Sequence, residues 1–458
     1  MNPRAFLIRR LFFPLASLRM GNRFAREYEA LRESQWRSSE QLRDLQSRRL
    51  RDLLRHAFQT VPFYRQSASD HGLSPDKFTE SEALQSLPVL SKREIREIGP
   101  DAFVSSGIPS PERIPYSTSG STGEPFSFFV DRGMVGNKIA RYFREMTAWG
   151  IEPGTPFLKL WGHGRVSTTG TEDEQSFFTK WILRRREASA FDLDEERASQ
   201  LLYLLRKQRL PVLEAYTSAA HFLAQCLRDG GGALPDLKVV VVSGETLAPE
   251  QERLIGEAFE ARVINAYGSR EFGRVAFSCP EGEGLHFSSE DFFAEYLDLD
   301  PPDAGGLKRL VLTCFANRAQ PFIRYDTGDL VLSSSSEACG CGRGLPLWRK
   351  VEGRLAERFL APSGRHVSVH FLTLLLEDFG REIRQFQAVA EPPSRLSLLV
   401  VPTPEYREMT GRFLRDKILE HVGSEMEVAV SCVEEIAVTG DGKRPLLRVR
   451  DRSETAAK

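Results

Sequence analysis

The stretch Tyr116-Ser-Thr-Ser-Gly-Ser-Thr-Gly-Glu-Pro125 concentrates five hydroxyl side chains and two glycines directly before the β-prone run Phe126-Ser-Phe-Phe-Val130. Glycine lets the backbone adopt positive φ and approach a ligand, while backbone N–H groups and hydroxyls donate hydrogen bonds to anionic oxygens. The stretch can therefore hold phosphate, but it lacks the Lys-[Ser/Thr] ending of a Walker loop, and Ser/Gly-rich surface linkers have the same composition. The candidate phosphate-binding residues are Ser117, Thr118, Ser119, Gly120, Ser121, Thr122 and Gly123.

The composition is that of a globular protein. The chain has 458 residues, 41% of them hydrophobic and 27% charged, which is enough apolar material for more than one core. Its 62 basic and 63 acidic residues leave a net charge of -1, so no global field attracts nucleic acid or an anionic membrane. The six cysteines are few and unevenly placed, and no convincing secretory signal is present. We therefore expect a cytoplasmic protein.

The N-terminal segment, residues 1–24, is basic and amphipathic. It mixes five arginines with apolar residues such as Phe6, Leu7 and Leu11, and its apolar run is too short to span a bilayer. Such a segment can lie peripherally on a membrane surface. We favour the alternative, a helix packed on the body of the protein or a frayed tail.

Short β-rich runs alternate with helical patterns between Phe126 and about Leu330. The run Leu237-Lys-Val-Val-Val-Val-Ser243, for example, precedes a helical pattern over Pro249 to Phe259. Continuously apolar strands of this kind are buried on both faces of a sheet. The alternation predicts an α/β fold with mixed or parallel sheets flanked by helices. An amphipathic helix over Ser39 to Gln59 is expected as scaffold.

After Arg354 the pattern changes to a compact α+β arrangement of about a hundred residues. We expect a hairpin around Pro362-Ser-Gly-Arg365, a helix from about His370, and a later helix from Glu405 to His421. Strands are expected near Leu396 to Val401 and over Met426 to Cys432. The predicted organisation is a basic segment over residues 1–30, a large domain over 31–354 and a small C-terminal domain over 355–458.

Five further motifs follow the hydroxyl-rich stretch in order. They are Val242-Ser-Gly-Glu-Thr246, Asn265-Ala-Tyr-Gly-Ser-Arg-Glu-Phe-Gly273, Arg324-Tyr-Asp-Thr-Gly-Asp-Leu330, Glu352-Gly-Arg354 and Gly442-Lys443. From about residue 30 to about 445, this order resembles the adenylate-forming (acyl-activating) superfamily. Within it, Val61-Pro-Phe-Tyr-Arg65, Leu87-Pro-Val-Leu-Ser-Lys92 and Cys339-Gly-Cys-Gly-Arg343 resemble the phenylacetate-coenzyme A ligases and their CapK-type relatives.

The resemblance implies an AMP-forming ligase. Such an enzyme uses Mg²⁺ and ATP to activate a carboxylic acid as an acyl adenylate, releases pyrophosphate, and passes the acyl group to a thiol such as coenzyme A. The small domain would act as a lid, and Lys443 would bridge the carboxylate and the α-phosphate, with Arg444 as the nearby fallback. A lysine on a Gly-rich loop is otherwise usually a solvated charge.

The nucleotide site is expected at the carboxyl ends of strands, where ligands of α/β sheets collect. By resemblance, Tyr267 flanks the adenine, Glu271 holds Mg²⁺ and Asp329 accepts the ribose hydroxyls, a carboxylate role that the turn at Gly328 allows. Arg354 follows a glycine at the domain junction, where its guanidinium could reach ribose or phosphate. The remaining candidates for nucleotide contact are Ser243, Gly244, Glu245, Ala266, Gly268 and Ser269. Solvated charges and a turn-forming aspartate are the alternatives for Glu271 and Asp329.

Four residues form a candidate structural zinc site. Cys279, His286, Cys339 and Cys341 supply three thiols and one imidazole, a set that suits tetrahedral zinc. The Cys-x-Cys spacing alone is a weak signal, and four independent residues are the alternative; related ligases carry a similar cluster. The other cysteines, Cys226, Cys314 and Cys432, lie in apolar surroundings and are interpreted as core thiols.

Two positions depart from the superfamily pattern. Glu124 stands where many members carry a lysine, which removes a positive charge near the pyrophosphate. The hinge after Arg354 reads Leu355-Ala-Glu-Arg358 where aspartates are usual, so Glu357 would have to substitute.

The acid and the acceptor are weakly specified. Trp161-Gly-His-Gly164 and Tyr216-Thr-Ser218 fall where the acyl pocket is expected and suggest an aryl or acyl acid; His163 could face the substrate or be an ordinary loop histidine. Coenzyme A is the expected acceptor, and related ligases often form homodimers. One alternative is CapK-type adenylation in capsular or surface polysaccharide biosynthesis. Another is a catalytically degenerate nucleotide-binding scaffold at a membrane.

Overall fold

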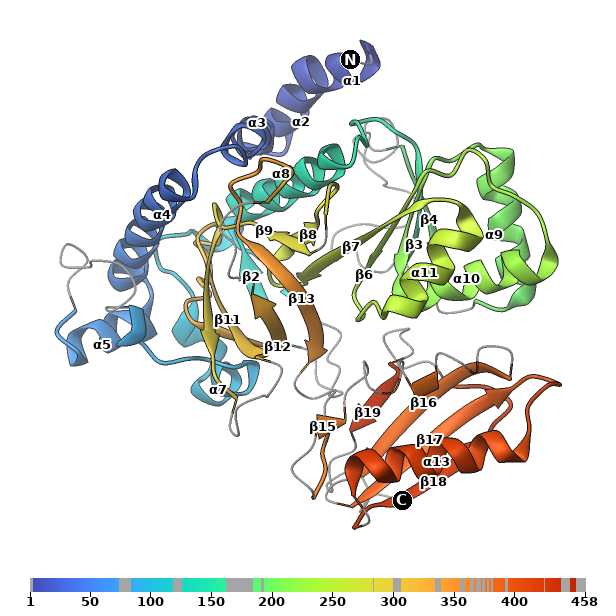
Figure 1. Ribbon diagram of the computed structural model, residues 1–458. Coiled ribbons are helices and arrows are strands. Elements are labelled where there is room, and N and C mark those ends of the chain that lie inside the picture. Colours follow the sequence, from blue (N-terminus) through green and yellow to red (C-terminus); the bar gives the residue numbers. More distant parts are fainter. Residues whose placement is uncertain are drawn as a thin grey trace.

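The computed structural model describes most of the chain (Figure 1). The described residues are 3–73, 84–117, 126–161, 184–190, 193–282, 284–299, 306–333, 339–354, 359–362, 366–367, 372, 375–376, 379, 382–391, 394–423, 425–437 and 445–449.

An 11-stranded sheet, in the order β10-β11-β12-β13-β9-β8-β7-β6-β5-β3-β4, is the centre of the molecule. Its strands from β3 to β7 are parallel, and the rest pair antiparallel. The parallel strands are β3 (Phe157–Trp161), β4 (Arg185–Ser189), β5 (Val212–Tyr216), β6 (Val239–Ser243) and β7 (Arg262–Ser269). The others are β8 (Gly273–Ser278), β9 (Leu285–Phe287), β10 (Phe292–Leu297), β11 (Lys308–Cys314), β12 (Tyr325–Ser333) and β13 (Leu347–Arg354). The predicted mixed α/β fold is confirmed.

The parallel half of the sheet is covered by α9 (Glu195–Lys207), α10 (Thr217–Gly230) and α11 (Pro249–Phe259) (Figure 1). Every residue of β5 and β6 is buried, as the continuous valine run of β6 predicts. The leucines and alanines of α9 and α10 pack against these strands in one apolar cluster. The helix predicted over Pro249 to Phe259 has these bounds in the structure.

The antiparallel half packs against N-terminal helices. These are α4 (Ser39–Thr60), α5 (Pro62–Asp70) and α7 (Lys92–Ile98), with α3 (Phe24–Ser34) lying on α8 (Arg132–Ala148). Short 3₁₀ turns span Pro100–Phe103 and Ser110–Glu112, and a hairpin of β1 (Ile114–Ser117) and β2 (Ser127–Val130) flanks the hydroxyl-rich stretch. Leucines of α4 enter the same core as Phe126 and Phe128. The scaffold helix predicted over Ser39 to Gln59 is confirmed.

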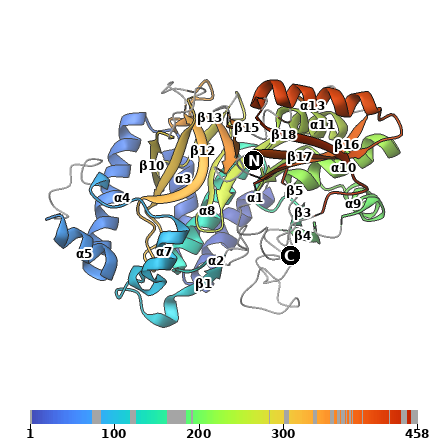
Figure 2. The ribbon, with the colours of Figure 1, turned by 90° about the horizontal axis from the view of Figure 1, so that it is seen from below.

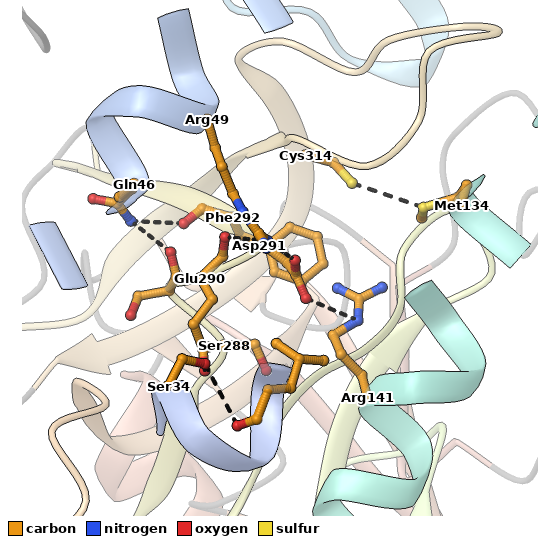
Figure 3. Close-up of polar contacts among 12 residues, drawn as sticks. Ser34, Gln46, Arg49, Met134, Arg141, Ser288, Glu290, Asp291, Phe292 and Cys314 are labelled. Carbon is orange, nitrogen blue, oxygen red and sulfur yellow. Dashed lines mark hydrogen bonds and ion pairs between the residues drawn. The ribbon is translucent and has the colours of Figure 1, made fainter. Parts of the chain in front are cut away.

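Buried ion pairs join α3, α4 and α8 to the turn before β10 (Figure 3). Arg144 Nη1 lies 3.2 Å from Glu290 Oε1, and both side chains are fully buried. Ser34 Oγ donates to the same carboxylate at 3.0 Å. Arg49 pairs with Asp291, which also lies 3.9 Å from Arg141 Nε. All five of these charged groups except Arg49 are buried, so each buried charge depends on its partner.

The residues after Arg354 build a separate four-stranded sheet, in the order β18-β17-β16-β19. It consists of β16 (Ile383–Glu391), β17 (Arg395–Pro402), β18 (Glu427–Cys432) and β19 (Leu447–Val449), with α13 (Glu408–Val422) packed against it. The strands β14 (Phe359–Leu360) and β15 (His366–Val367) pair antiparallel, which confirms the hairpin predicted around Pro362 to Arg365. This small module lies beside α9–α11 (Figure 2), where Gln225 Nε2 donates to Arg384 O at 3.2 Å.

One cysteine assignment is wrong. Cys432, predicted as a core thiol, is exposed, because it ends β18 at the edge of the small sheet. Cys314 is buried as predicted, and Cys226 is half-buried. No residue of β18 is buried at this edge position, which a single-strand apolar pattern does not reveal.

The chain begins with a helical arm made of α1 (Pro3–Leu7), a π turn (Ile8–Phe12) and α2 (Phe13–Arg19). Ala5, Ile8 and Phe13 are buried, and the last two pack against α3 and α8, so the predicted packed helix is confirmed for this face. The π turn matters for this packing, since it brings Ile8 and Phe13, five residues apart, onto one side. None of the helices in the described part of the chain is long and apolar enough to cross a membrane.

Candidate nucleotide site

The turn between β7 and β8 carries two of the predicted site residues. Tyr267 lies on β7, and Glu271 follows within the tight turn to β8. A side chain at Gly268 would meet Gly273 O at 2.2 Å, so the two strand ends approach as closely as only glycine permits. The turn therefore presents Tyr267 and Glu271 at the carboxyl end of a parallel strand, as predicted.

Glu271 is a buried, ionised carboxylate. It is 2% exposed, and its Oε1 lies 2.8 Å from Lys92 Nζ and accepts a hydrogen bond from Tyr325 OH at 2.9 Å. Burial raises its pKa, but the Lys92 ammonium and hydrogen bonds, one of them from Ser269, outweigh burial and leave the pKa below its usual value. Glu271 therefore carries a negative charge at neutral pH in a site that almost excludes water.

Lys92 reaches Glu271 because the segment before it is bonded to β12. Leu90 N donates to Arg324 O at 3.0 Å, and Asp326 N donates to Leu90 O at 2.9 Å. Ser91 then begins α7 with a capping box, which fixes the direction of the helix. The sequence places Lys92 in a family-like segment but gives it no role, since its partner lies far away in the chain.

Tyr267 and Asp329 contact each other directly. Tyr267 OH donates to Asp329 Oδ2 at 2.5 Å, and burial together with the neighbouring carboxylate raises the pKa of Tyr267 well above its ordinary value. Asp329 follows a turn at Gly328, whose φ is +72°, as predicted for this position. Strand pairing sets Arg354 of β13 opposite Asp329 of β12. Three predicted residues are thus neighbours.

The segment after β6 lies against an aromatic pair. Gly244 has a φ of +84°, and a Cβ there would lie 3.0 Å from the Tyr216 ring. Tyr216 stacks on Trp161 with ring centroids 4.1 Å apart, so the ends of β3, β5 and β6 form one aromatic surface. Ser243 Oγ donates to Ala266 O at 2.5 Å, which ties this segment to β7. Only glycine suits this φ and this contact, and the approach of Gly244 to an adenine stays a prediction.

Glu245 has a structural contact that the sequence does not predict. Its carboxylate accepts hydrogen bonds from Ser218 N at 2.7 Å and Ser218 Oγ at 3.0 Å at the start of α10. An ionised carboxylate at a helix N-terminus is stabilised by the unpaired N–H groups there. Glu245 therefore joins the segment after β6 to α10.

Two cations lie at the start of the hydroxyl-rich stretch. Arg270 Nε donates to Ser117 O at 3.2 Å, and Lys138 Nζ lies 4.7 Å from the centre of the Tyr116 ring. Lys138 Nζ also donates to Arg270 O at 2.8 Å, and burial lowers its pKa to about 7. Neither cation could be assigned from the sequence, because α8 and the β7–β8 turn are far apart in the chain.

The four predicted zinc ligands converge. Their donor atoms all lie within 4.8 Å of one another, with Cys279 Sγ 3.4 Å from Cys339 Sγ and Cys341 Sγ 3.2 Å from His286 Nε2. Three sulfurs and one imidazole at these separations fit a tetrahedral Zn²⁺ ion. The loop that carries Cys339 and Cys341 is packed so closely that a Cβ at Gly344 would meet Arg37 O at 1.8 Å.

Several predicted residues lie outside the described part of the chain. These are Thr118 to Pro125 of the hydroxyl-rich stretch with Glu124, His163, the hinge residues 355–358, and Lys443 with Arg444. Their assignments stay predictions. The helix expected from about His370 is described only in part.

No family model matches the chain. It is 26% identical over 400 residues to the phenylacetate-coenzyme A ligase of Thermus thermophilus, covering 83% of this chain and 86% of that ligase. It is also 32% identical over 305 residues to the phenylacetate-coenzyme A ligase of Aromatoleum evansii, covering 64% of this chain and 67% of the relative. The chain belongs to the phenylacetate-coenzyme A ligase family.

Solved structures support the fold of this phenylacetate-coenzyme A ligase relative. A 2-hydroxyisobutyryl-CoA ligase in its postadenylation state superposes with a TM-score of 0.72 at 20% identity, covering 93% of this chain and 92% of that one. An anthranilate CoA ligase in complex with anthranoyl-AMP gives a TM-score of 0.51 at 15% identity, covering 72% and 65%. The family member thus has the adenylate-forming ligase fold that the motif order implies.

Proposed function

We propose that this protein is an AMP-forming acid–thiol ligase. In the first half-reaction a carboxylate oxygen of the acid attacks the α-phosphorus of ATP, and the bond to pyrophosphate breaks. In the second, the sulfur of coenzyme A attacks the acyl carbon and AMP leaves. The observation that carries the proposal is the gathering of ionised Glu271, the Tyr267–Asp329 pair and Gly244 at neighbouring strand ends of a family member.

The described residues suit separate parts of ATP. Asp329, whose carboxyl group accepts a hydrogen bond from Tyr267, would take the ribose hydroxyls, with Arg354 on the opposing strand. The aromatic face of Tyr267 and the backbone at Gly244 would border the adenine. Glu271 would hold Mg²⁺, which neutralises charge on the phosphates. The residues Ser117 to Gly123 would hold the phosphates, and Lys443 would bridge the reacting groups.

We propose an aryl acid of the phenylacetate type as substrate. The stacked Trp161 and Tyr216 at the ends of β3 and β5 offer an aromatic surface beside Gly244. Aromatic rings pack favourably on such surfaces at centroid distances of about 4.5–7 Å. The printed names of the relatives point to the same class of acid. Coenzyme A is the proposed acceptor.

We also propose that the chain divides after Arg354 into a large domain and a small lid domain. Among the described residues, every strand of the 11-stranded sheet lies at or before Arg354, and every strand of the small sheet lies after it. A lid domain that is joined to the large domain by one connection can change its position between the two half-reactions.

Pyrophosphate release tests the proposed function. Release from Mg·ATP should require one class within a panel of aryl, fatty and amino acids, and Lys443→Ala should abolish it. Lys417→Ala, on the exposed face of α13, is the matched control and should release pyrophosphate at the rate of the unsubstituted protein. Thioester formation with coenzyme A would support the ligase.

Other outcomes separate the alternatives. Release without thioester formation would favour transfer to a sugar or lipid-linked acceptor, as in polysaccharide biosynthesis. A protein that binds ATP and releases no pyrophosphate with any acid would contradict the ligase and favour a nucleotide-binding scaffold.

We propose structural zinc at Cys279, His286, Cys339 and Cys341, supported by their convergence. Metal analysis of the purified protein should give about one equivalent of zinc. The variant Cys339→Ser/Cys341→Ser should lose the zinc ion. It should also unfold at a lower temperature, because the segments that the ion joins are no longer held together. Cys226→Ser, at a half-buried thiol outside the cluster, should keep the metal. Full zinc content in the double variant would refute the site.

A further inference from the structure

The N-terminal arm, residues 3–19, has one buried face and one exposed face. One face is buried: Ala5, Ile8 and Phe13 are at most 3% exposed, and Ile8 and Phe13 pack with α3 and α8. Edge-to-face contacts of Phe13 with Phe24 and Tyr28 hold it there. The arm is therefore a docked helix, and its outer face has a fixed direction. In Figure 1 it lies at the end of the molecule away from the small module.

The outer face of the arm is apolar. Leu7, Leu11, Leu15 and Leu18 recur at helical spacing, and Leu18 is 79% exposed. Eleven large hydrophobic side chains are exposed among the described residues, and five of them belong to this arm: Phe6, Leu7, Leu11, Leu15 and Leu18. Such a concentration is unlike the scattered exposed leucines of ordinary surfaces and marks an interaction face.

Exposed positive charge flanks this stripe. The sequence from residue 3 to residue 26 contains no acidic residue. Its exposed arginines are Arg4, Arg10, Arg19, Arg23 and Arg26. Arg184, distant in the chain, has its pKa lowered by burial and by the positive charges of Arg4 and Arg186, so cations from two segments lie near the start of the arm. The surroundings of the stripe thus favour an anionic partner.

We propose that the N-terminal arm lies in the plane of an anionic lipid surface, with Leu7, Leu11, Leu15 and Leu18 in the acyl boundary and the arginines at the headgroups. An amphipathic, arginine-rich helix has the composition of interfacial helices. Each basic residue near an anionic surface adds attraction. A second copy of the chain fits less well, because a two-fold contact would bring the arginines of both arms together. This proposal is independent of the ligase chemistry.

Vesicle flotation of the full-length protein tests the proposal. The protein should float with vesicles of phosphatidylcholine containing about one third phosphatidylglycerol, and less with pure phosphatidylcholine. The variant Leu11→Gln/Leu15→Gln/Leu18→Gln changes only exposed side chains, so the fold should persist. Its partition coefficient should fall about a hundred-fold or more. Raised salt should weaken binding of the unsubstituted protein.

A control distinguishes the effect of the leucine stripe on vesicle binding from that of any other exposed apolar side chain. Met409→Gln removes an apolar side chain that is 75% exposed in the small module, and it should float like the unsubstituted protein. Equal flotation of the triple variant and the unsubstituted protein would overturn the proposal, as would absence of flotation with anionic vesicles. A lipid-free dimer that the triple variant dissociates would assign the stripe to a second copy instead.

Discussion

Glu271→Gln is expected to lower the rate of pyrophosphate release about a hundred-fold or more, because it removes the ionised carboxylate proposed to hold Mg²⁺. The glutamine keeps the size of the side chain and can still accept from Tyr325 OH, so the effect should lie in the chemistry. Loss of this carboxylate should also raise the Mg²⁺ concentration needed for half-maximal rate. Stopped reactions over a Mg²⁺ series would measure both quantities.

The matched control is Glu257→Gln, since Glu257 is 60% exposed on α11 and pairs only with a surface arginine of the same helix in the described contacts. It should keep the rate and the Mg²⁺ requirement. If Glu271 merely anchors Lys92, Lys92→Met should reproduce both the rate and the thermal stability of Glu271→Gln. Such identical behaviour, with an unchanged Mg²⁺ requirement, would rule out the metal-binding role.

Glu290→Ala should cost about 3–5 kcal/mol of unfolding free energy, the largest stability effect we expect from a single substitution. It leaves the fully buried Arg144 without its carboxylate partner and removes the acceptor of Ser34 (Figure 3). Urea unfolding followed by tryptophan fluorescence and circular dichroism would measure the change.

Two further variants identify the cause. Glu427→Ala breaks an exposed pair with Arg395, which water screens, and should cost far less stability than Glu290→Ala. The double variant Arg144→Met/Glu290→Leu removes both charges and should regain much of the stability that Glu290→Ala loses, because no uncompensated charge stays buried. If Glu290→Ala and Glu427→Ala lower the free energy of unfolding by the same small amount, the buried ion pairs do not stabilise the fold.

The sequence predicts what depends on local pattern. The valine run of β6 and the periodicity of α4 fix their types, and motif order reveals the family. The convergence of Cys279, His286, Cys339 and Cys341 was also anticipated, because thiols and imidazoles are rare and point to one chemistry.

Long-range pairings explain what the sequence does not reveal. Lys92 meets Glu271 only because Leu90 bonds to Arg324 across the fold, and nothing near Lys92 announces that partner. Arg144 and Glu290 are charged residues of types that usually lie on the surface. They become buried only when α8 packs on the turn before β10. The exposure of Cys432 follows from its place on an edge strand, a property of the assembled sheet.

The buried charges of Glu290 and Asp291 also determine when parts of the chain can complete their folding during synthesis. Arg49 precedes Glu290 by 241 residues and Arg144 precedes it by 146, so both arginines leave the ribosome long before their partners exist. Until then the contacts of α3, α4 and α8 with the turn before β10 cannot form, and incomplete packing of this kind favours misassociation. The hydrophobic core of the small module consists of residues from its own segment of the chain. Nascent chains that end before residue 290 should therefore depend on chaperones, whereas the final segment can fold as it emerges.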